Sequence, residues 1–432
     1  MSVEHPCAVV GAQTGVAFPT SLDNLLDQGA EFLTRALRAT GAIGADNAVT
    51  AIAASSEFFG GGMGRKLWLT VSYARDEPGL DKDLFVKFPR EFGDPLRDLF
   101  GPLMEPEVRF ALLSMQPDFP VQVPKCYFAD YDPATISGLL ITARIPYGSD
   151  GIESCPEKCR DYQLADPLPY YQALTLDMAR LAGAHKAGRL GDDLPSRFPF
   201  DPDVIDPGSR IPFTPELLQQ KLETLRAFVA GMPQMFPDGL AETVETFIAE
   251  VPMVLDLELG IRRFLNSRAD MIALCHWNMN LDNAWFSRAE DGALSAGLLD
   301  WGSVGQMNVA QAFFGMTCAA EPDFLIAHRR TLIDLFVAEF AASGGPLIDA
   351  DEMALMVKLS MAVLGVAWML DAPSLVAQEL PDYAKIKDRF DPRLTGNFLA
   401  HAQAHLLRVL MSEWHHDDIG GALRAFQNKG VV

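Results

Sequence analysis

Residues 275–286 read CHWNMNLDNAWF, and the interpretation of the whole chain depends on this stretch. It carries His276, Asn278 and Asn283, and it is followed by GLLDWGSVGQ, in which Asp300 comes after an apolar run. The apolar run predicts a buried strand with Asp300 at its end. Amide and carboxylate oxygens are the ligands that Mg²⁺ prefers when it bridges nucleotide phosphates. The pattern therefore predicts Asn283 and Asp300 as magnesium ligands.

Upstream of this loop, residues 48–90 have the pattern of β-strands. Glycine-rich and polar turns separate three strand candidates: AVTAIAAS, KLWLTVSYA and DLFVKFP. A helix is predicted over 105–115, followed by two more strands in KCYFADY and SGLLITARI. These segments predict a small antiparallel sheet.

The flanking regions have helical periodicity. Leucines in 20–40 recur on one helical face, which predicts a helix that docks on the body of the protein. After residue 146 the apolar spacing of three and four dominates to the end. We therefore expect an α+β fold in three parts: an N-terminal segment at 1–44, an antiparallel-sheet lobe at 45–145, and a large helical lobe at 146–432 that holds the loop at 275–303.

The predicted sheet lobe contains groups suited to phosphate binding. Lys87 lies in LFVKFP between apolar neighbours, where a lysine is rarely simply solvated. Glu107 is the best candidate for a carboxylate that holds it, and Glu105 is the alternative. A cluster of glycines in FFGGGMG leaves the backbone free to approach an anion; these are Gly60, Gly61, Gly62 and Gly64.

Together these motifs resemble a known enzyme family. HWNMNLDNAWF with GLLDWGSVGQ is similar to the paired signatures of the aminoglycoside phosphotransferase and choline kinase superfamily, which has a protein kinase-like fold. The order of GGGMGRKLWLTVSY, FVKFP, EVRFALL and LARLAGAHKAG resembles its CHK kinase-like and ecdysteroid kinase-like branch. The resemblance covers roughly residues 50–315 and rests mainly on the two later motifs.

The resemblance implies ATP and Mg²⁺ as cofactors and a small-molecule hydroxyl as phosphate acceptor. It implies that Lys87 binds phosphate, with Glu107 as its partner and the glycines covering the phosphates. It further implies that His276 is a structural loop histidine, that His185 ends the first helix of the large lobe, and that Thr142 to Ile145 form the hinge that meets adenine.

Two positions depart from the family pattern. Position 278 is asparagine where the catalytic aspartate is expected, and Gln311 stands where a later aspartate is usual. An amide can orient a hydroxyl but cannot take its proton, and general-base assistance is worth about 10²- to 10⁴-fold in rate. Asp282 in the same loop is an alternative base. Slow phosphotransfer and a catalytically dead pseudokinase that binds nucleotide or a small ligand are therefore both open.

Composition narrows the choice of partners. The net charge of -22 disfavours nonspecific binding to nucleic acid or to anionic membranes. We find no apolar run near the ~20 residues of a membrane span and no signal peptide, so we expect a cytoplasmic protein with reduced thiols. A third interpretation is a helical metal site, in which His401 and His405 share a helix face.

Overall fold

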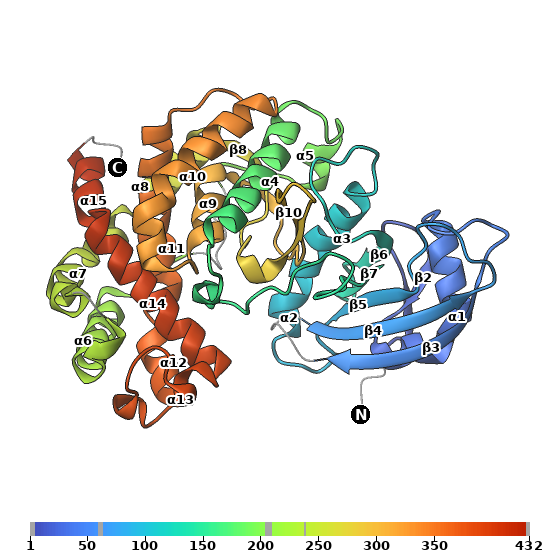
Figure 1. Ribbon diagram of the computed structural model, residues 1–432, viewed down its shortest axis with the longest axis horizontal. Coiled ribbons are helices and arrows are strands. Elements are labelled where there is room, and N and C mark those ends of the chain that lie inside the picture. The colour runs from blue at the N-terminus through green and yellow to red at the C-terminus, as the bar shows by residue number, and fades with distance from the viewer. Residues whose placement is uncertain (1–4, 59–63, 204–209, 237–238, 429–432) are drawn as a thin grey trace. The chain divides into compact units, whose positions relative to one another are not determined.

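The computed structural model describes residues 5–58, 64–203, 210–236 and 239–428, and the chain divides into two compact units (Figure 1). Unit 1 is the chain up to Glu153 together with Asp192–Phe198 and Gly297–Val304, and unit 2 is the remainder. Unit 1 is built on an antiparallel sheet and unit 2 is mainly helical, which confirms the predicted α+β class.

Unit 1 has a sheet of five strands in the order β3-β4-β5-β7-β6, with each neighbouring pair antiparallel. Its described elements are β1 (Ala8–Val10), β2 (Ala17–Pro19), α1 (Leu22–Ala39), β3 (Val49–Phe58), β4 (Gly64–Tyr73), β5 (Asp83–Pro89), α2 (Arg97–Phe100), α3 (Met104–Leu113), β6 (Cys126–Asp132), β7 (Ser137–Ala143) and α5 (Leu194–Arg197). The three strands and the helix predicted between 48 and 115 are therefore present.

The two faces of this sheet are covered by different helices. Leu139 and Ile141 of β7 belong to a core that includes α1, whereas Leu140 packs with side chains of α3. Successive strand residues point to opposite faces. On β5, Val86 and Phe88 enter the α1 core, and Lys87 between them therefore faces α3. This alternation positions the lysine of the candidate site.

The predicted docking helix is α1. The side chain of Ser21 caps its first turn by accepting a hydrogen bond from the Asn24 N–H, at 3.2 Å. Leu22, Leu33 and Leu37 are buried in the sheet core. Burying this apolar face, rather than helix propensity alone, stabilises such a segment.

Unit 2 is a group of helices, with short strands between residues 272 and 308. Its described helices are α4 (Leu168–Lys186), α6 (Pro215–Gly231), α7 (Val244–Glu250), α8 (Pro252–Ser267), α9 (Val309–Thr317), α10 (Pro322–Ala342), α11 (Ala350–Met369), α12 (Ala372–Glu379), α13 (Pro392–Thr395), α14 (Phe398–His416) and α15 (Ile419–Asn428). The helical pattern over 240–265 is divided into α7 and α8 at Pro252, because proline lacks an N–H and favours the first helical turn.

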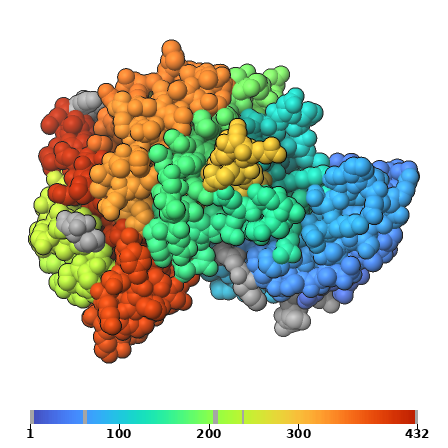
Figure 2. Space-filling view, viewed as in Figure 1, coloured from blue at the N-terminus to red at the C-terminus, as the bar shows by residue number. Residues whose placement is uncertain are grey.

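Short strands frame residues 275–303. β8 (Ile272–Cys275) pairs with β11 (Gly305–Asn308), and β9 (Ala284–Arg288) pairs with β10 (Leu294–Leu298). The turn between β9 and β10, residues 289–293, is exposed, and Figure 2 shows this region of the chain at the surface in gold. The strand expected to end at Asp300 ends two residues earlier, at Leu298.

Among the described residues, one helical segment has the length and apolarity of a membrane span, which corrects the expectation that no such run exists. It covers Ala350–Glu379, and 78% of its most apolar window is buried inside the protein. A core helix that is surrounded by other helices has the same composition.

Candidate functional site

Lys87 and Glu107 form a buried ion pair in unit 1. The Lys87 ammonium donates to both carboxylate oxygens of Glu107, at 2.7 and 3.0 Å, and each side chain is only 5% exposed. Glu107 lies on α3, which packs on the sheet face toward which Lys87 points. Glu105, the alternative partner, pairs with Arg109 instead.

Asp300 is the second carboxylate on Lys87. The Lys87 Nζ to Asp300 Oδ1 distance is 2.8 Å, and the Asp300 side chain is 40% exposed. Asp300 has a φ of 59°, a left-handed conformation that is uncommon for residues other than glycine. Such outliers persist only where the surroundings fix the chain.

The neighbouring tryptophan supplies that constraint. Trp301 is 5% exposed and stacks on Phe110 of α3, with ring centroids 3.7 Å apart, and its indole N–H donates to the Leu298 carbonyl at 3.1 Å. Phe110 lies one turn after Glu107 on α3. The helix that holds Glu107 therefore also anchors the segment that carries Asp300.

The charges of this cluster are strongly coupled. Burial alone would lower the pKa of Lys87, but the carboxylate of Glu107, followed by that of Asp300, more than offsets burial and raises this pKa. Burial raises the pKa of Glu107, Lys87 opposes this, and Asp300 adds to it. Lys87 is therefore charged, and two carboxylates share it.

Sequence reasoning missed a second lysine in this cluster. Lys66 of β4 is the cross-strand partner of Lys87, on the same face of the sheet. Burial lowers the pKa of Lys66, the charge of Lys87 lowers it further, and Asp300 and Glu107 oppose the shift. Only the β4–β5 register brings the two lysines together, so no local pattern in the sequence signals it.

The predicted glycine-rich turn is only partly described. Gly60, Gly61 and Gly62 lie outside the described residues. Gly64 begins β4, and a Cβ built there would stand 2.0 Å from the Phe88 carbonyl oxygen. Close strand approach is therefore a structural reason for glycine at 64.

The predicted hinge residues lie at the end of β7 and just beyond it. Thr142 is buried on β7, opposite Phe85 of β5. Ile145 lies just past the strand, and its carbonyl accepts from the Tyr147 N–H at 3.1 Å. Their assignment to adenine stays a prediction.

Unit 2 holds the loop at 276–283, which is closed by its own side chains. The Asn278 N–H donates to Nδ1 of His276 at 3.1 Å, and the Asn283 amide donates to the Asn278 carbonyl at 2.8 Å. The Asn280 amide donates to the side-chain oxygen of Asn278. His276 is 1% exposed, which suits a structural role. Sequence reasoning did not single out Asn280.

Three contacts surround this loop and the strand that precedes it. Nδ1 of His185, in the last turn of α4, accepts from the Leu274 N–H at 3.0 Å. A Cβ at Gly315 of α9 would stand 1.6 Å from the Trp277 carbonyl oxygen, so glycine permits the close approach. The Cys155 thiol lies 3.0 Å from the Leu281 carbonyl.

Asp282 lies near two cysteines, Cys159 and Cys318. Burial is the main cause that raises the pKa of Cys318 to about 11, and the Asp282 carboxylate adds to the shift. The pKa of Cys159 is also raised, first by burial and in part by Asp282. The predicted role of Asp282 as an alternative base stays a prediction.

The groups in unit 1 have the chemistry of a nucleotide–metal site. A carboxylate that is partly exposed can take a hard cation, and Asp300 is that group. With Asp300 on a cation, Glu107 would remain as the partner of Lys87, and Lys66 would lie on the same face of the sheet as a second lysine. Asn283, in unit 2, stays a predicted ligand.

Comparisons with known proteins give remote structural neighbours. No family model matches the sequence, and no curated protein matches it. A choline kinase from Cryptosporidium parvum is 12% identical over 88% of this chain and 91% of its own, with a TM-score of 0.39. A choline/ethanolamine kinase family protein from Mesorhizobium loti is 13% identical over 90% and 98%, with a TM-score of 0.39.

A spectinomycin phosphotransferase in complex with ADP and spectinomycin is 12% identical over 82% of this chain and 94% of its own, with a TM-score of 0.39. These neighbours are small-molecule kinases and phosphotransferases. Likeness at this level assigns neither a family nor an activity to this chain, and the ecdysteroid kinase-like branch stays a resemblance of the sequence.

Proposed function

We propose that this protein is an ATP-dependent phosphotransferase that moves the γ-phosphate of magnesium-bound ATP to a hydroxyl of a small molecule. In this proposal Lys87 binds the α- and β-phosphates, Glu107 holds the lysine in place, and Asp300 holds magnesium. Phosphoryl transfer needs mainly positioning and charge stabilisation, which these groups supply.

One observation carries the proposal. Lys87 is held at 2.7 Å by Glu107 and at 2.8 Å by Asp300. Kinase-type phosphoryl transfer requires a strand lysine paired with a helical glutamate and a metal-binding aspartate from a later loop. An isolated structural ion pair would need only one carboxylate. Lys87 has a second carboxylate partner, Asp300, and its partial exposure puts it within reach of a ligand.

Asn278 sets the expected rate. Its amide can orient the acceptor hydroxyl but cannot act as a base near neutral pH. The expected cost of this missing carboxylate is about 10²- to 10⁴-fold in rate. We therefore propose slow turnover.

A second candidate is a nucleotide-binding protein without turnover. The contact that favours it is the hydrogen bond from the Asn280 amide to the side-chain oxygen of Asn278. This bond engages the oxygen that would otherwise face an acceptor hydroxyl. In this case ATP binds in the same way but is not consumed.

The first experiment measures ATP binding by calorimetry with and without magnesium. We expect binding that depends on magnesium in the wild type, a loss of that dependence in Asp300→Ala, and no change in Asp98→Ala, an exposed aspartate of unit 1. Absence of ATP binding by the wild type would refute both candidates.

Asn278→Asp then separates the two candidates. The aspartate keeps an oxygen that accepts from Asn280, so the loop geometry should persist. If the wild type consumes ATP slowly in an acceptor screen and Asn278→Asp accelerates it about 10²-fold or more, the enzyme is supported. If ATP binds to both proteins and neither consumes it, the binding protein is supported.

A further inference from the structure

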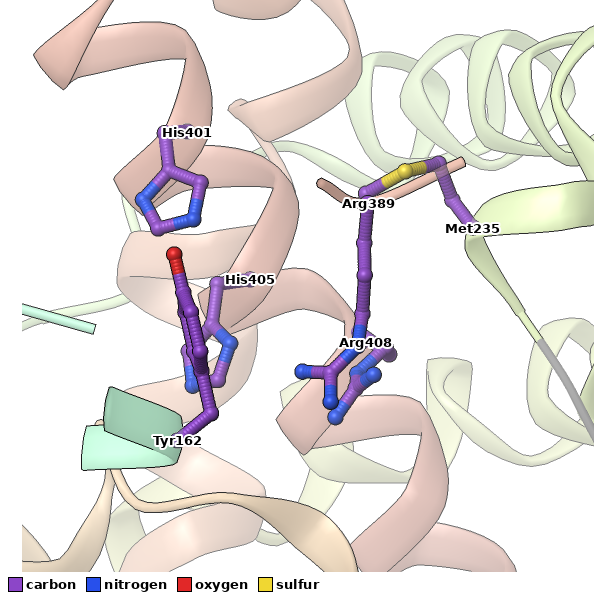
Figure 3. A pocket seen from close by; sticks show the side chains of 6 residues that line it. All are labelled: Tyr162, Met235, Arg389, His401, His405 and Arg408. Atoms are coloured by element: carbon purple, nitrogen blue, oxygen red, sulfur yellow. The ribbon is translucent and has the colours of Figure 1, made fainter. Parts of the chain in front are cut away.

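Unit 2 contains a small pocket formed by four segments far apart in the sequence (Figure 3). Its lining residues are Tyr162, Met235, Arg389, His401, His405 and Arg408. The cavity volume is about 10 Å³, close to the room for one water molecule, and the pocket opens to solvent at its mouth. The pocket can therefore take only a small polar group, with the rest of any ligand at the open mouth.

The residues from α14 form a stripe that runs inward. Phe398, His401, His405 and Arg408 recur at helical spacing on one face. Phe398 is 57% exposed, whereas Arg408 is 5% exposed. The stripe therefore has an exposed apolar residue at one end and a buried guanidinium at the other.

Two arginines line the pocket. Arg389 and Arg408 both donate to the same carboxylate oxygen of Glu321, so their guanidinium groups lie side by side, as Figure 3 shows. Arg389 uses only Nη1 for its hydrogen bonds among the described residues, and the buried Nε of Arg408 has no partner there. A buried donor without an acceptor is destabilising, so an acceptor in the pocket would be favourable.

A metal ion is the competing occupant. Asp161, Glu321 and His405 offer ligand atoms within 4.8 Å of one another. However, both oxygens of Glu321 already accept from arginine. A divalent cation there would face two guanidinium groups at close range, and the charge of each would repel it.

The neighbouring carboxylates limit the charge of an anionic ligand. Glu321 and Asp161 balance Arg389 and Arg408 in formal charge, so a dianion would leave the group two charges negative. A carboxylate adds one charge, and its planar oxygens match the guanidinium donors. Tyr162, whose hydroxyl makes no hydrogen bond within the described part of the chain and points toward His401 in Figure 3, is a further donor.

The pocket is connected to the loop that holds Asn278. The Cys318 thiol lies 3.9 Å from the side-chain oxygen of Asn280, and the next residue, Ala319, accepts from the His405 ring at 2.8 Å. We propose that the pocket binds the carboxylate of a singly charged organic anion, and that this anion is the acceptor; the second part rests on the proposed function.

The first test measures binding of benzoate by calorimetry in the absence of nucleotide, with benzamide as the neutral ligand of the same shape. We expect benzoate to bind at least 10-fold more tightly than benzamide. Arg389→Gln and Arg408→Gln should each weaken benzoate binding about 10- to 100-fold, the range for one charge-assisted hydrogen bond. Arg330→Gln, whose side chain is 60% exposed on α10, should have no effect.

Arg389→Gln keeps the test decisive if Arg408→Gln does not fold, because the Arg389 side chain is 27% exposed. Equal binding of benzoate and benzamide, tighter binding of inorganic phosphate, or unchanged benzoate binding by Arg389→Gln would overturn the pocket assignment. So would stoichiometric Zn²⁺ binding that is lost in His405→Asn, if benzoate does not bind.

The second test asks whether the anion is the acceptor. ATP consumption is compared with 4-(hydroxymethyl)benzoate and its amide, and faster consumption with the carboxylate is expected. If benzoate binds but the two alcohols are consumed equally, the acceptor assignment fails. If ATP does not bind while benzoate does, the proposed function fails and the pocket stands.

Discussion

The ion pair of Lys87 and Glu107 allows a quantitative test of how the site is built. Lys87→Met leaves Glu107, 4% exposed, without its main partner and still close to Asp300. Breaking a buried pair in this way costs about 3–5 kcal/mol of unfolding free energy. The positive charge of Lys66 still favours the Glu107 carboxylate, so we expect a loss of unfolding free energy at the lower end of this range, about 3 kcal/mol. Lys87→Met combined with Glu107→Gln removes the orphaned charge and should recover about 2 kcal/mol.

The loss of stability in Lys87→Met should depend on pH in a definite direction. In Lys87→Met, the influence that lowers the pKa of Glu107 is removed, while burial and Asp300 still raise it. A group whose pKa is raised in the folded state stabilises the protein below its ordinary pKa, near 4.5, and loses this contribution as pH rises through the folded pKa. The stability deficit of Lys87→Met should therefore grow from pH 5 to pH 8.

The assay is urea unfolding at both pH values. Lys82→Met serves as the control, since Lys82 forms an exposed pair with Asp76 and should change stability by at most ~1 kcal/mol. Equal stability of Lys87→Met and the double variant at pH 8 would refute the reasoning, because it would mean that Glu107 is not a buried charge that depends on Lys87.

Three further predictions concern the framework around the site. Gly64→Ala should cost about 1–3 kcal/mol in urea unfolding because its Cβ would meet the Phe88 carbonyl at 2.0 Å, whereas Gly305→Ala, with open space around it, should cost less than 1 kcal/mol. Gly315→Ala should displace the loop at 276–283, because the added Cβ would stand 1.6 Å from the Trp277 carbonyl oxygen. We expect altered NMR signals from this loop, and unchanged signals would contradict the prediction. Burial lowers the pKa of His185 to about 4, so the wild type should lose stability as pH falls from 6.5 toward 4. His185→Gln should lose less stability over this range. Equal acid sensitivity of the two proteins would contradict this prediction.

Much of unit 1 could be predicted from local sequence patterns. Lys87 between apolar residues indicated a strand, and the helix that carries Glu107 followed at kinase-like spacing. These signals are local, because strand alternation and helical periodicity are properties of neighbouring residues. The division of the helical pattern at Pro252 also had a local cause, and the proline was its signal.

The contacts that complete the candidate site required the tertiary structure. Lys66 meets Lys87 because of strand register, and Trp301 stacks on Phe110 because the folded chain returns to α3. The pocket beside Arg408 joins segments far apart in the chain. Strand register and long-range packing depend on the total burial and hydrogen bonding of the folded chain. They therefore cannot be predicted from any single segment of the sequence. The sequence alone therefore determined which residue types were available for phosphate chemistry, and the tertiary structure decided which of them meet.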